Sequence, residues 1–187
     1  FLAHDGLPSE DEQFAAYRDA VLGAGGLPVT IRTLDLGADK ADAAGLTIAS
    51  EPNPALGVRG VRLSLRQIDV FVTQLRAILR ASCYGPLRIL VPMITDAAEL
   101  VEVRRLIDEC ARDLRTAGHE IPDQFELGAM VEVPAAAINV HTLLEVADFL
   151  AIGSNDLTQY VLAADRNNDQ LGTLYHPAHP AVLRMLA

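Results

Sequence analysis

Short apolar runs alternate with longer amphipathic stretches along most of the chain. In the amphipathic stretches, apolar residues recur every three or four positions, which is the spacing of a helix with one buried face. The apolar runs are short and bounded by glycine, proline or polar residues, which is typical of buried strands. We therefore expect strands at residues 29–34, 87–93, 126–133 and 149–153.

Capping residues and glycines indicate where the helices begin and end. Ser9 and Glu12 form a capping-box pattern, and the Gly25-Gly26 pair ends the helix that follows it. A second helix is expected from about Arg66 to Ser82. The other expected boundaries are a cap at Thr95 with a stop at Gly118, a helix start at Pro134, another at about Leu157, and a helix over residues 181–187.

Strands that alternate with helices long enough to cross over predict a parallel sheet with helices outside it. A (βα)8 TIM barrel needs about 250 residues, whereas this chain has 187 and four predicted strands. We therefore expect an incomplete barrel with about half of its strands, forming one partial domain over residues 1–187. An open, doubly wound sheet is the alternative.

The composition restricts the partners of the protein. The formal net charge is −10, which argues against nucleic acid or an anionic membrane surface as the main partner. We find no run as long and apolar as a transmembrane helix and no signal peptide at the start. The two cysteines are far apart and form no metal-binding pattern, which suits a reducing, cytoplasmic location.

Polar residues follow the predicted strands where each strand ends. Arg32 and Asp35 lie near the end of the first strand, and Glu132 lies near the end of the third. Asn155 and Asp156 come directly after the fourth. The carboxyl ends of parallel strands meet at one edge of a sheet, where ligands usually bind. Their common position predicts a site.

These residue types suit a small, multiply anionic metabolite bridged by a metal ion. Glu132 and Asp156 offer hard oxygen ligands for Mg²⁺, or for Mn²⁺, with substrate and water filling the other positions. Arg32 and Arg166 offer planar guanidinium groups that match phosphate oxygens. Asn155 and the first backbone N–H groups of the next helix can hold a carboxylate or a phosphate.

Each of these residues also has a simpler interpretation. Asn155 or Asp156 can act only as a helix cap, and Arg32 can pair with Asp35. Glu132 can be solvated at the rim of the sheet. Arg59, between glycines, is a phosphate contact or a surface charge. Lys40, the only lysine, is either a residue whose compact ammonium group is needed or a chance loop residue. His176 and His179 are disfavoured as a pair of metal ligands, because the prolines around them favour extended backbone.

Six motifs, in order along nearly the whole chain, resemble the C-terminal domain of Enzyme I of the bacterial phosphotransferase system. This family is also called the phosphoenolpyruvate-protein phosphotransferases. The motifs are TLDLGADK, NPALGVRGVRLSL, LRILVPMI, GAMVEVPAA, IGSNDLTQYVLAADRNND and LYHPAHPAVL. The nitrogen-regulatory paralogue and the fused multiphosphoryl transfer proteins are similar, and the motifs do not separate these branches.

The resemblance implies a role for each candidate residue. In the family, a barrel that dimerises binds phosphoenolpyruvate and Mg²⁺ at the carboxyl ends of its strands. By resemblance, Glu132 and Asp156 are the metal ligands. The implied substrate-binding residues are Arg32, Asn155, Asp156 and Arg166, with Lys40 and Arg59 as supporting contacts.

The resemblance also implies a reaction that needs parts outside this chain. The family transfers the phosphoryl group of phosphoenolpyruvate to a histidine of the same protein, releases pyruvate, and passes the phosphoryl group to the carrier protein HPr. The acceptor histidine belongs to an N-terminal domain, and a cysteine that protonates the enolate lies downstream of the matching region. We therefore expect no catalytic residue within these 187 positions and no activity from this piece alone.

Three other functions remain open at this stage. A domain of the pyruvate phosphate dikinase or phosphoenolpyruvate synthase type would perform the same half-reaction with a different donor domain. A metal-dependent aldolase or lyase barrel would use the same carboxylates on a pyruvate enolate. A piece that serves only dimerisation or regulation would bind no ligand in a metal-dependent way.

Overall fold

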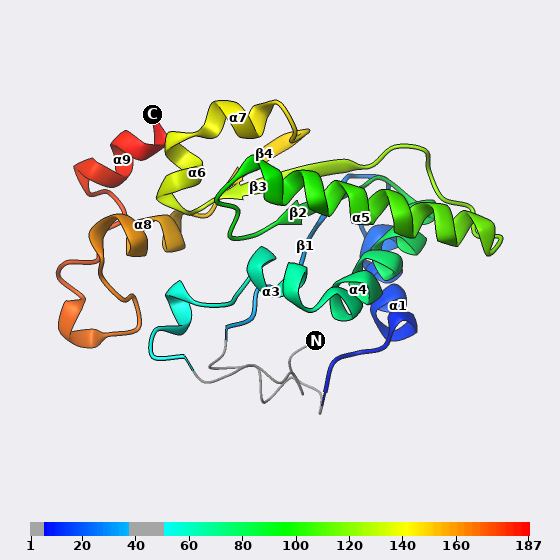
Figure 1. Ribbon diagram of the computed structural model, residues 1–187, viewed down its shortest axis with the longest axis horizontal. Helices are drawn as coiled ribbons and strands as arrows, with labels where there is room; N and C mark the ends of the chain where they lie inside the picture. The colour runs from blue at the N-terminus through cyan, green and yellow to red at the C-terminus, as the bar shows by residue number, and fades with distance from the viewer. Residues whose placement is uncertain (1–5, 38–50) are drawn as a thin grey trace.

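The computed structural model describes residues 6–37 and 51–187. Its centre is a parallel four-stranded sheet in which each strand pairs with the next one along the chain (Figure 1). The predicted strands are confirmed, with ends shifted by three residues or fewer. Their bounds are β1 Val29–Arg32, β2 Leu87–Val91, β3 Glu126–Val131 and β4 Phe149–Ile152.

The strand register brings the carboxyl ends of all four strands to one edge of the sheet. Arg32 of β1 lies opposite Leu90 of β2, and Val131 of β3 lies opposite Ile152 of β4. The segments that leave this edge are therefore neighbours, although they are separated by tens of residues in sequence. The segments after β1, β3 and β4 contain the polar residues that the sequence places at strand ends.

One face of the sheet packs against helices and forms the main core. Three long helices supply most of the buried side chains: α1 Glu10–Gly23, α4 Ile68–Ala81 and α5 Ala97–Thr116. Figure 1 shows α5 crossing in front of the sheet, with α4 and α1 beside it. Alternate strand residues point into this core, including Ile89, Val91, Leu127 and Ala129. Burying this apolar surface is the main source of the stability of the fold.

The opposite face of the sheet is partly exposed and carries both polar side chains and apolar ones such as Leu90 and Phe149. Thr30, Arg32 and Glu126 are exposed there. The Nε of Arg88 lies 2.5 Å from a carboxylate oxygen of Glu126 on the neighbouring strand. A doubly wound sheet carries helices on both faces, whereas the strand residues of this face lie outside the main core of the described residues. The four strands form an open sheet, so closure into a barrel is not observed.

Shorter helices lie near the carboxyl edge of the sheet. Figure 1 shows α6, α8 and α9 together beyond the ends of β3 and β4. The bounds are α3 Val61–Arg66, α6 Pro134–Ile138, α7 Val140–Leu144, α8 Ser154–Leu162 and α9 Pro180–Leu186. Single 3-10 turns occur at Pro54–Leu56, Ser82–Tyr84 and Asp169–Leu171.

The predicted helix starts are partly right. Ser9 caps α1 in a capping box with Glu12, and Pro134 is the first residue of α6, as predicted. The predicted cap at Thr95 is wrong: Asp96 is the N-cap of α5, because its carboxylate accepts the Ala98 N–H. Thr95 instead donates to Glu99 from its N–H and its hydroxyl.

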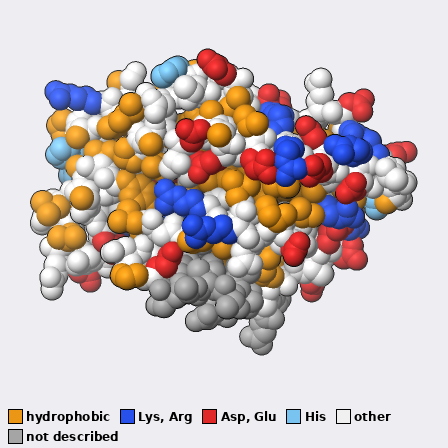
Figure 2. All heavy atoms as spheres, in the orientation of Figure 1, with side chains coloured by type: hydrophobic (Ala, Val, Ile, Leu, Met, Phe, Trp, Pro, Cys, Tyr) orange, Lys and Arg blue, Asp and Glu red, His pale blue; other side chains and the backbone are white. Residues whose placement is uncertain are grey.

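Charged and apolar side chains are unevenly distributed over the face drawn in Figure 2. Figure 2 shows acidic and basic groups interspersed along α5 and a hydrophobic area over the region of α6 and α9. Exposed apolar residues there include Ile138 and Leu183. Among the helices of the described ranges, none is long and apolar enough to cross a membrane.

Candidate functional site

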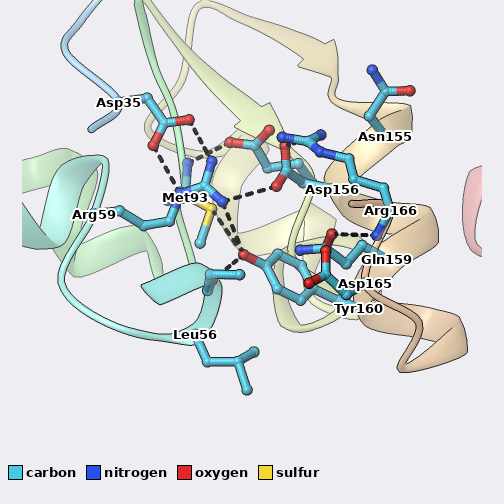
Figure 3. A network of polar contacts seen from close by, with 12 residues as sticks. Asp35, Leu56, Arg59, Met93, Asn155, Asp156, Gln159, Tyr160, Asp165 and Arg166 are labelled. Carbon is cyan, nitrogen blue, oxygen red and sulfur yellow. Dashed lines mark hydrogen bonds and ion pairs between the residues drawn. The ribbon is translucent and has the colours of Figure 1, made fainter. Parts of the chain in front are cut away.

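Asp156 lies in the first turn of α8, directly after β4, and its carboxylate is held by two arginines. Its Oδ1 accepts a hydrogen bond of 3.0 Å from Nη1 of Arg59, and its Oδ2 accepts one of 3.3 Å from Nη1 of Arg166 (Figure 3). The helix begins at Ser154, and its N-cap, Gly153, has no side chain to cap it. The interpretation of Asn155 or Asp156 as a helix cap is therefore wrong.

Arg59 lies at the centre of this network. Its Nε and Nη2 donate to both carboxylate oxygens of Asp35, at 3.0 and 2.7 Å. The side chains of Arg59 and Asp35 are 11% and 5% exposed. Burial alone would lower the pKa of Arg59, but the hydrogen bonds and charge of Asp35, with the charge of Asp156, raise it above its usual value. The guanidinium therefore stays protonated, and Asp35 pairs with Arg59 rather than with Arg32.

Tyr160 ties the segment that carries Arg59 to helix α8. Its hydroxyl donates to the carbonyl oxygen of Ala55 and accepts a 3.4 Å hydrogen bond from Nη1 of Arg59. Figure 3 shows the Tyr160 ring reaching from α8 toward Arg59 and Met93. The hydroxyl thus contacts both the loop backbone and the guanidinium, which limits the positions that Arg59 can take.

Glu132 is a buried carboxylate at the end of β3, only 1% exposed. Its Oε1 accepts a 2.7 Å hydrogen bond from the backbone N–H of Met93. Met93 has a φ of 63°, which is uncommon for a residue with a side chain, and this conformation accompanies the contact. Burial is the main reason that the pKa of Glu132 is raised to about 7, and the charges of Asp156 and Asp35 add to it. The Met93 N–H and Arg59 act in the opposite direction.

Gly153 leaves the space that Glu132 occupies. A Cβ at this position would lie 2.5 Å from the Cβ of Glu132 and closer still to its Oε2. Such contacts require the neighbour to move, so only glycine fits here without displacing the carboxylate. A glycine between a strand and a helix therefore allows close approach, and its φ of −94° makes no use of left-handed backbone freedom.

The donor set suits a divalent cation in part. Glu132 Oε2 accepts no hydrogen bond from the described residues, and the charge of the carboxylate interacts with those of Asp156 and Asp35. Hard carboxylate oxygens are the ligands that Mg²⁺ and Mn²⁺ prefer. No group of three or more His, Cys, Asp or Glu within residues 6–37 and 51–187 is arranged to hold a metal ion alone. An ion here would need ligands from elsewhere.

Of the remaining predicted residues, those that the structure describes lie apart from the network. Arg32 is exposed on the open face of the sheet and makes no polar contact with the part of the chain that the structure describes. Asn155 is exposed, and its side chain points away from Arg59 in Figure 3. Lys40 lies outside the described residues. His179 caps α9 and His176 accepts the Ala178 N–H, so each ring has a local structural role.

Several residues of the network carry no sequence signal that singles them out. Tyr160 and Gln159 look like ordinary positions of an amphipathic helix. Gln159 is buried, and its Oε1 accepts the backbone N–H of Arg166 at 3.1 Å, which positions the start of the loop after α8. The sequence indicates Asp35 as a polar residue near a strand end, but it does not indicate its partner, Arg59, which lies 24 positions further along the chain.

A cavity lies away from this network. It has a volume of about 270 Å³ and is lined mainly by apolar residues from the start of α1, from α3 and from α4, including Leu63, Val70 and Phe71. Its lining offers few groups that would bind a multiply charged anion. The charged network at the carboxyl edge of the sheet is therefore the better candidate for a functional site.

A parallel sheet with buried carboxylates and arginines at its carboxyl edge is typical of α/β proteins that bind small anionic ligands there. The chain belongs to the family described as PEP-utilising enzyme, PEP-binding domain, which it matches over residues 1–187.

The chain is also similar to bacterial proteins named phosphoenolpyruvate-protein phosphotransferase. It is 50% identical to that of Cupriavidus necator over 184 residues, which are 98% of this chain and 31% of the relative. It is 46% identical to that of Latilactobacillus sakei over 180 residues, 96% of this chain and 31% of the relative. For that of Staphylococcus aureus the identity is 44% over 186 residues, 100% of this chain and 32% of the relative. The chain thus spans about a third of the length of these relatives.

Proposed function

We propose that this chain is part of the phosphoenolpyruvate-binding domain of a phosphoenolpyruvate-protein phosphotransferase. The whole protein would transfer the phosphoryl group of phosphoenolpyruvate to one of its own histidines and release pyruvate, as the first step of a sugar phosphotransferase system. The observation that carries the proposal is the buried Asp35–Arg59–Asp156 ion-pair network, with the exposed Arg166 beside it, at the strand ends of a chain that matches the family throughout.

The network supports binding of a multiply charged anion. Phosphoryl transfer places charge on the peripheral oxygens of the transferring group, so catalysis consists mostly of positioning and electrostatic stabilisation. Arg59 and Arg166 bring two guanidinium groups to one carboxylate, and a phosphate can accept from the same donors. Asp35 fixes the orientation of Arg59, and Arg32 faces the open side of the same edge.

Glu132 and Asp156 would hold Mg²⁺, or Mn²⁺, and phosphoenolpyruvate and water would supply its other ligands. A divalent ion would supply positive charge against the substrate oxygens. Glu132 offers its unpartnered Oε2, and Gly153 keeps that oxygen uncrowded. Asp156 would exchange part of its guanidinium contacts for the ion. Asn155, with the backbone of Asp156, would contact the substrate after its side chain turns inward, and Lys40 would be a supporting contact.

The proposed architecture of the whole domain is a closed (βα)8 barrel of which residues 1–187 form about half. The sheet face that lies outside the main core supports this proposal, because in a barrel that face is covered by the other strands. The phosphohistidine domain and the remaining strands would lie outside this chain. The intact protein would be a cytoplasmic homodimer that hands its phosphoryl group to HPr, and this chain alone would be inactive.

Calorimetric titration of the full-length protein with phosphoenolpyruvate tests the proposal. We expect binding that requires Mg²⁺ and that is lost in Glu132→Ala. Glu126→Ala is the matched control, because Glu126 is an exposed carboxylate at the opposite end of the same strand. Failure of the wild-type protein to bind phosphoenolpyruvate with Mg²⁺ present, or equal loss in both variants, would contradict the proposal.

A further inference from the structure

The Arg59 guanidinium occupies the space between two buried carboxylates. Its Nε and Nη2 are bonded to Asp35, and its Nη1 is bonded to Asp156 at 3.0 Å. All three nitrogens are therefore used, and both partners are acids that are less than a tenth exposed. Within the described ranges, no other arginine joins two carboxylates that are both buried.

The two ends of this bridge differ in strength. Asp35 accepts two parallel hydrogen bonds, which is the strongest arrangement for an arginine and a carboxylate. Asp156 accepts a single bond from Arg59, through a nitrogen that also contacts the Tyr160 hydroxyl. Asp156 has a second cationic partner in Arg166. The Arg59–Asp156 contact is therefore the one that can break while Arg59 remains bound to Asp35.

A divalent cation and Arg59 would compete for the same oxygen atoms. Glu132 is buried beside Asp156, and its negative charge interacts with those of Asp156 and Asp35. Arg59 partly neutralises this cluster. A metal ion that takes Asp156 as a ligand brings two positive charges close to the guanidinium, and like charges at short range repel.

We propose that Arg59 is the resident cation of the Asp35–Glu132–Asp156 cluster, and that a divalent cation displaces it from Asp156 but not from Asp35. The inference rests on the proposed function for the identity of that cation. Arg59 then lowers the affinity of the empty site for free metal. Once released, its Nη1 is available to an anion, so metal and anion binding favour each other, and the coupling is reciprocal.

Titration of the full-length protein with Mn²⁺, in the absence of phosphoenolpyruvate, tests this inference by calorimetry. We expect Arg59→Gln to lower the dissociation constant for Mn²⁺ about tenfold, the equivalent of losing one partly buried ion pair. Arg59→Lys keeps the charge but lacks the fork that spans two carboxylates, so a smaller decrease is expected. Arg66→Gln, at an exposed arginine at the end of α3, is the control for the change of charge and should not alter the constant.

The outcomes are distinct. Mn²⁺ affinity that is unchanged or weaker in Arg59→Gln overturns the inference, as does an equal gain in Arg66→Gln or no Mn²⁺ binding by any variant. If Arg59→Gln does not fold, Arg59→Lys takes its place in the test, and an Mn²⁺ affinity that is unchanged or weaker in that variant overturns the inference. The titration with phosphoenolpyruvate is a separate measurement. Tighter Mn²⁺ binding by Arg59→Gln, together with no phosphoenolpyruvate binding by the wild type, supports this inference and refutes the proposed function. Phosphoenolpyruvate binding by the wild type, together with no gain in Mn²⁺ affinity in Arg59→Gln, supports the proposed function and refutes this inference.

Discussion

Arg80 and Arg59 each join two carboxylates, in very different surroundings. At the contact between α1 and α4, Nη1 of Arg80 lies 2.7 Å from both Glu10 and Asp11. At the carboxyl edge of the sheet, Arg59 joins Asp35 and Asp156. Asp11 is 83% exposed, whereas Asp156 is 9% exposed.

The difference separates a structural ion pair from the one that we propose to be functional. Arg80 also lies over the ring of Phe14, 4.3 Å from its centroid, so it helps to pack two helices while its partners remain hydrated. Around Arg59 three acids are withdrawn from water, and one of them, Glu132, lacks a cationic partner in direct contact. Buried charge of this kind adds little stability compared with apolar packing. Its presence at the sheet edge is therefore consistent with the binding role that we propose.

The largest expected change in stability comes from replacing Arg59, compared with replacing Arg80. Arg59→Met leaves Asp35 without its cation beside two other acids, so we expect the free energy of unfolding to fall by about 3–5 kcal/mol. Arg80→Met leaves its acids in contact with water and should cost about 1 kcal/mol. Urea unfolding at neutral pH measures both. Equal losses of stability in the two variants would show that burial does not distinguish the Arg59 cluster from the Arg80 cluster.

The second expected effect is a dependence of stability on pH that arises from Glu132. Its pKa in the folded protein, about 7, lies above its ordinary value of 4.5. Between these values the folded protein binds more protons than the unfolded chain, so stability falls as the pH rises through this window. Glu132→Gln removes the penalty and should be more stable than wild type at pH 8, by on the order of 3 kcal/mol.

Urea unfolding of wild type and Glu132→Gln, without divalent metal, at pH 5 and pH 8 measures this effect. The difference between the two proteins should be small at pH 5. Glu126→Gln serves as the control, because this carboxylate is exposed at the start of β3. A wild-type protein that is more stable than Glu132→Gln at pH 8 would contradict a buried carboxylate whose ionisation opposes folding.

A third effect concerns the space between β4 and α8. Gly153→Ala places a Cβ against the Glu132 carboxylate, so the hydrogen bond from Met93 must lengthen or the helix must shift. Overpacking of this kind costs about 1–3 kcal/mol. Gly23→Ala, at the end of α1, is the control because nothing lies within 4 Å of its added Cβ. The melting temperature of each variant measures the difference. A Gly153→Ala protein as stable as wild type would show that the residues around Glu132 can move aside without loss of stability.

The elements of the fold were largely predictable from the sequence because each is encoded locally. A run such as Leu87–Val91 is apolar and short, and Ser9 with Glu12 specifies a helix start within four residues. Errors occurred where neighbouring residues compete for one role. Thr95 and Asp96 are both good caps, and Asp96 takes the role through a capping box with Glu99. The helix predicted from about Arg66 to Ser82 corresponds to α4, whereas the short helix α3 directly before it was not predicted.

The site was predictable in position and poorly predictable in its contacts. Parallel strands bring their carboxyl ends together, so the general location of Glu132 and Asp156 follows from topology. The central place of Arg59 does not, because its partners Asp35 and Asp156 lie 24 and 97 positions away and nothing local links them. The left-handed conformation of Met93 is equally non-local, since its N–H is directed at Glu132 from a different strand.

The smallest expected change in the free energy of unfolding concerns the hydrated cluster around Arg80. Glu10 accepts hydrogen bonds from Arg76 and Arg80 at 2.7 Å each, and these contacts lower its pKa although partial burial opposes them. Glu10→Gln keeps the shape of the side chain and removes its charge, so we expect a loss of no more than about 1 kcal/mol. Because the pair is partly hydrated, 1 M salt should reduce the difference from wild type. Urea unfolding at low and high salt measures it. A loss as large as that of Arg59→Met, or one that salt does not reduce, would mean that the α1–α4 pair is shielded from water in the same way as the site.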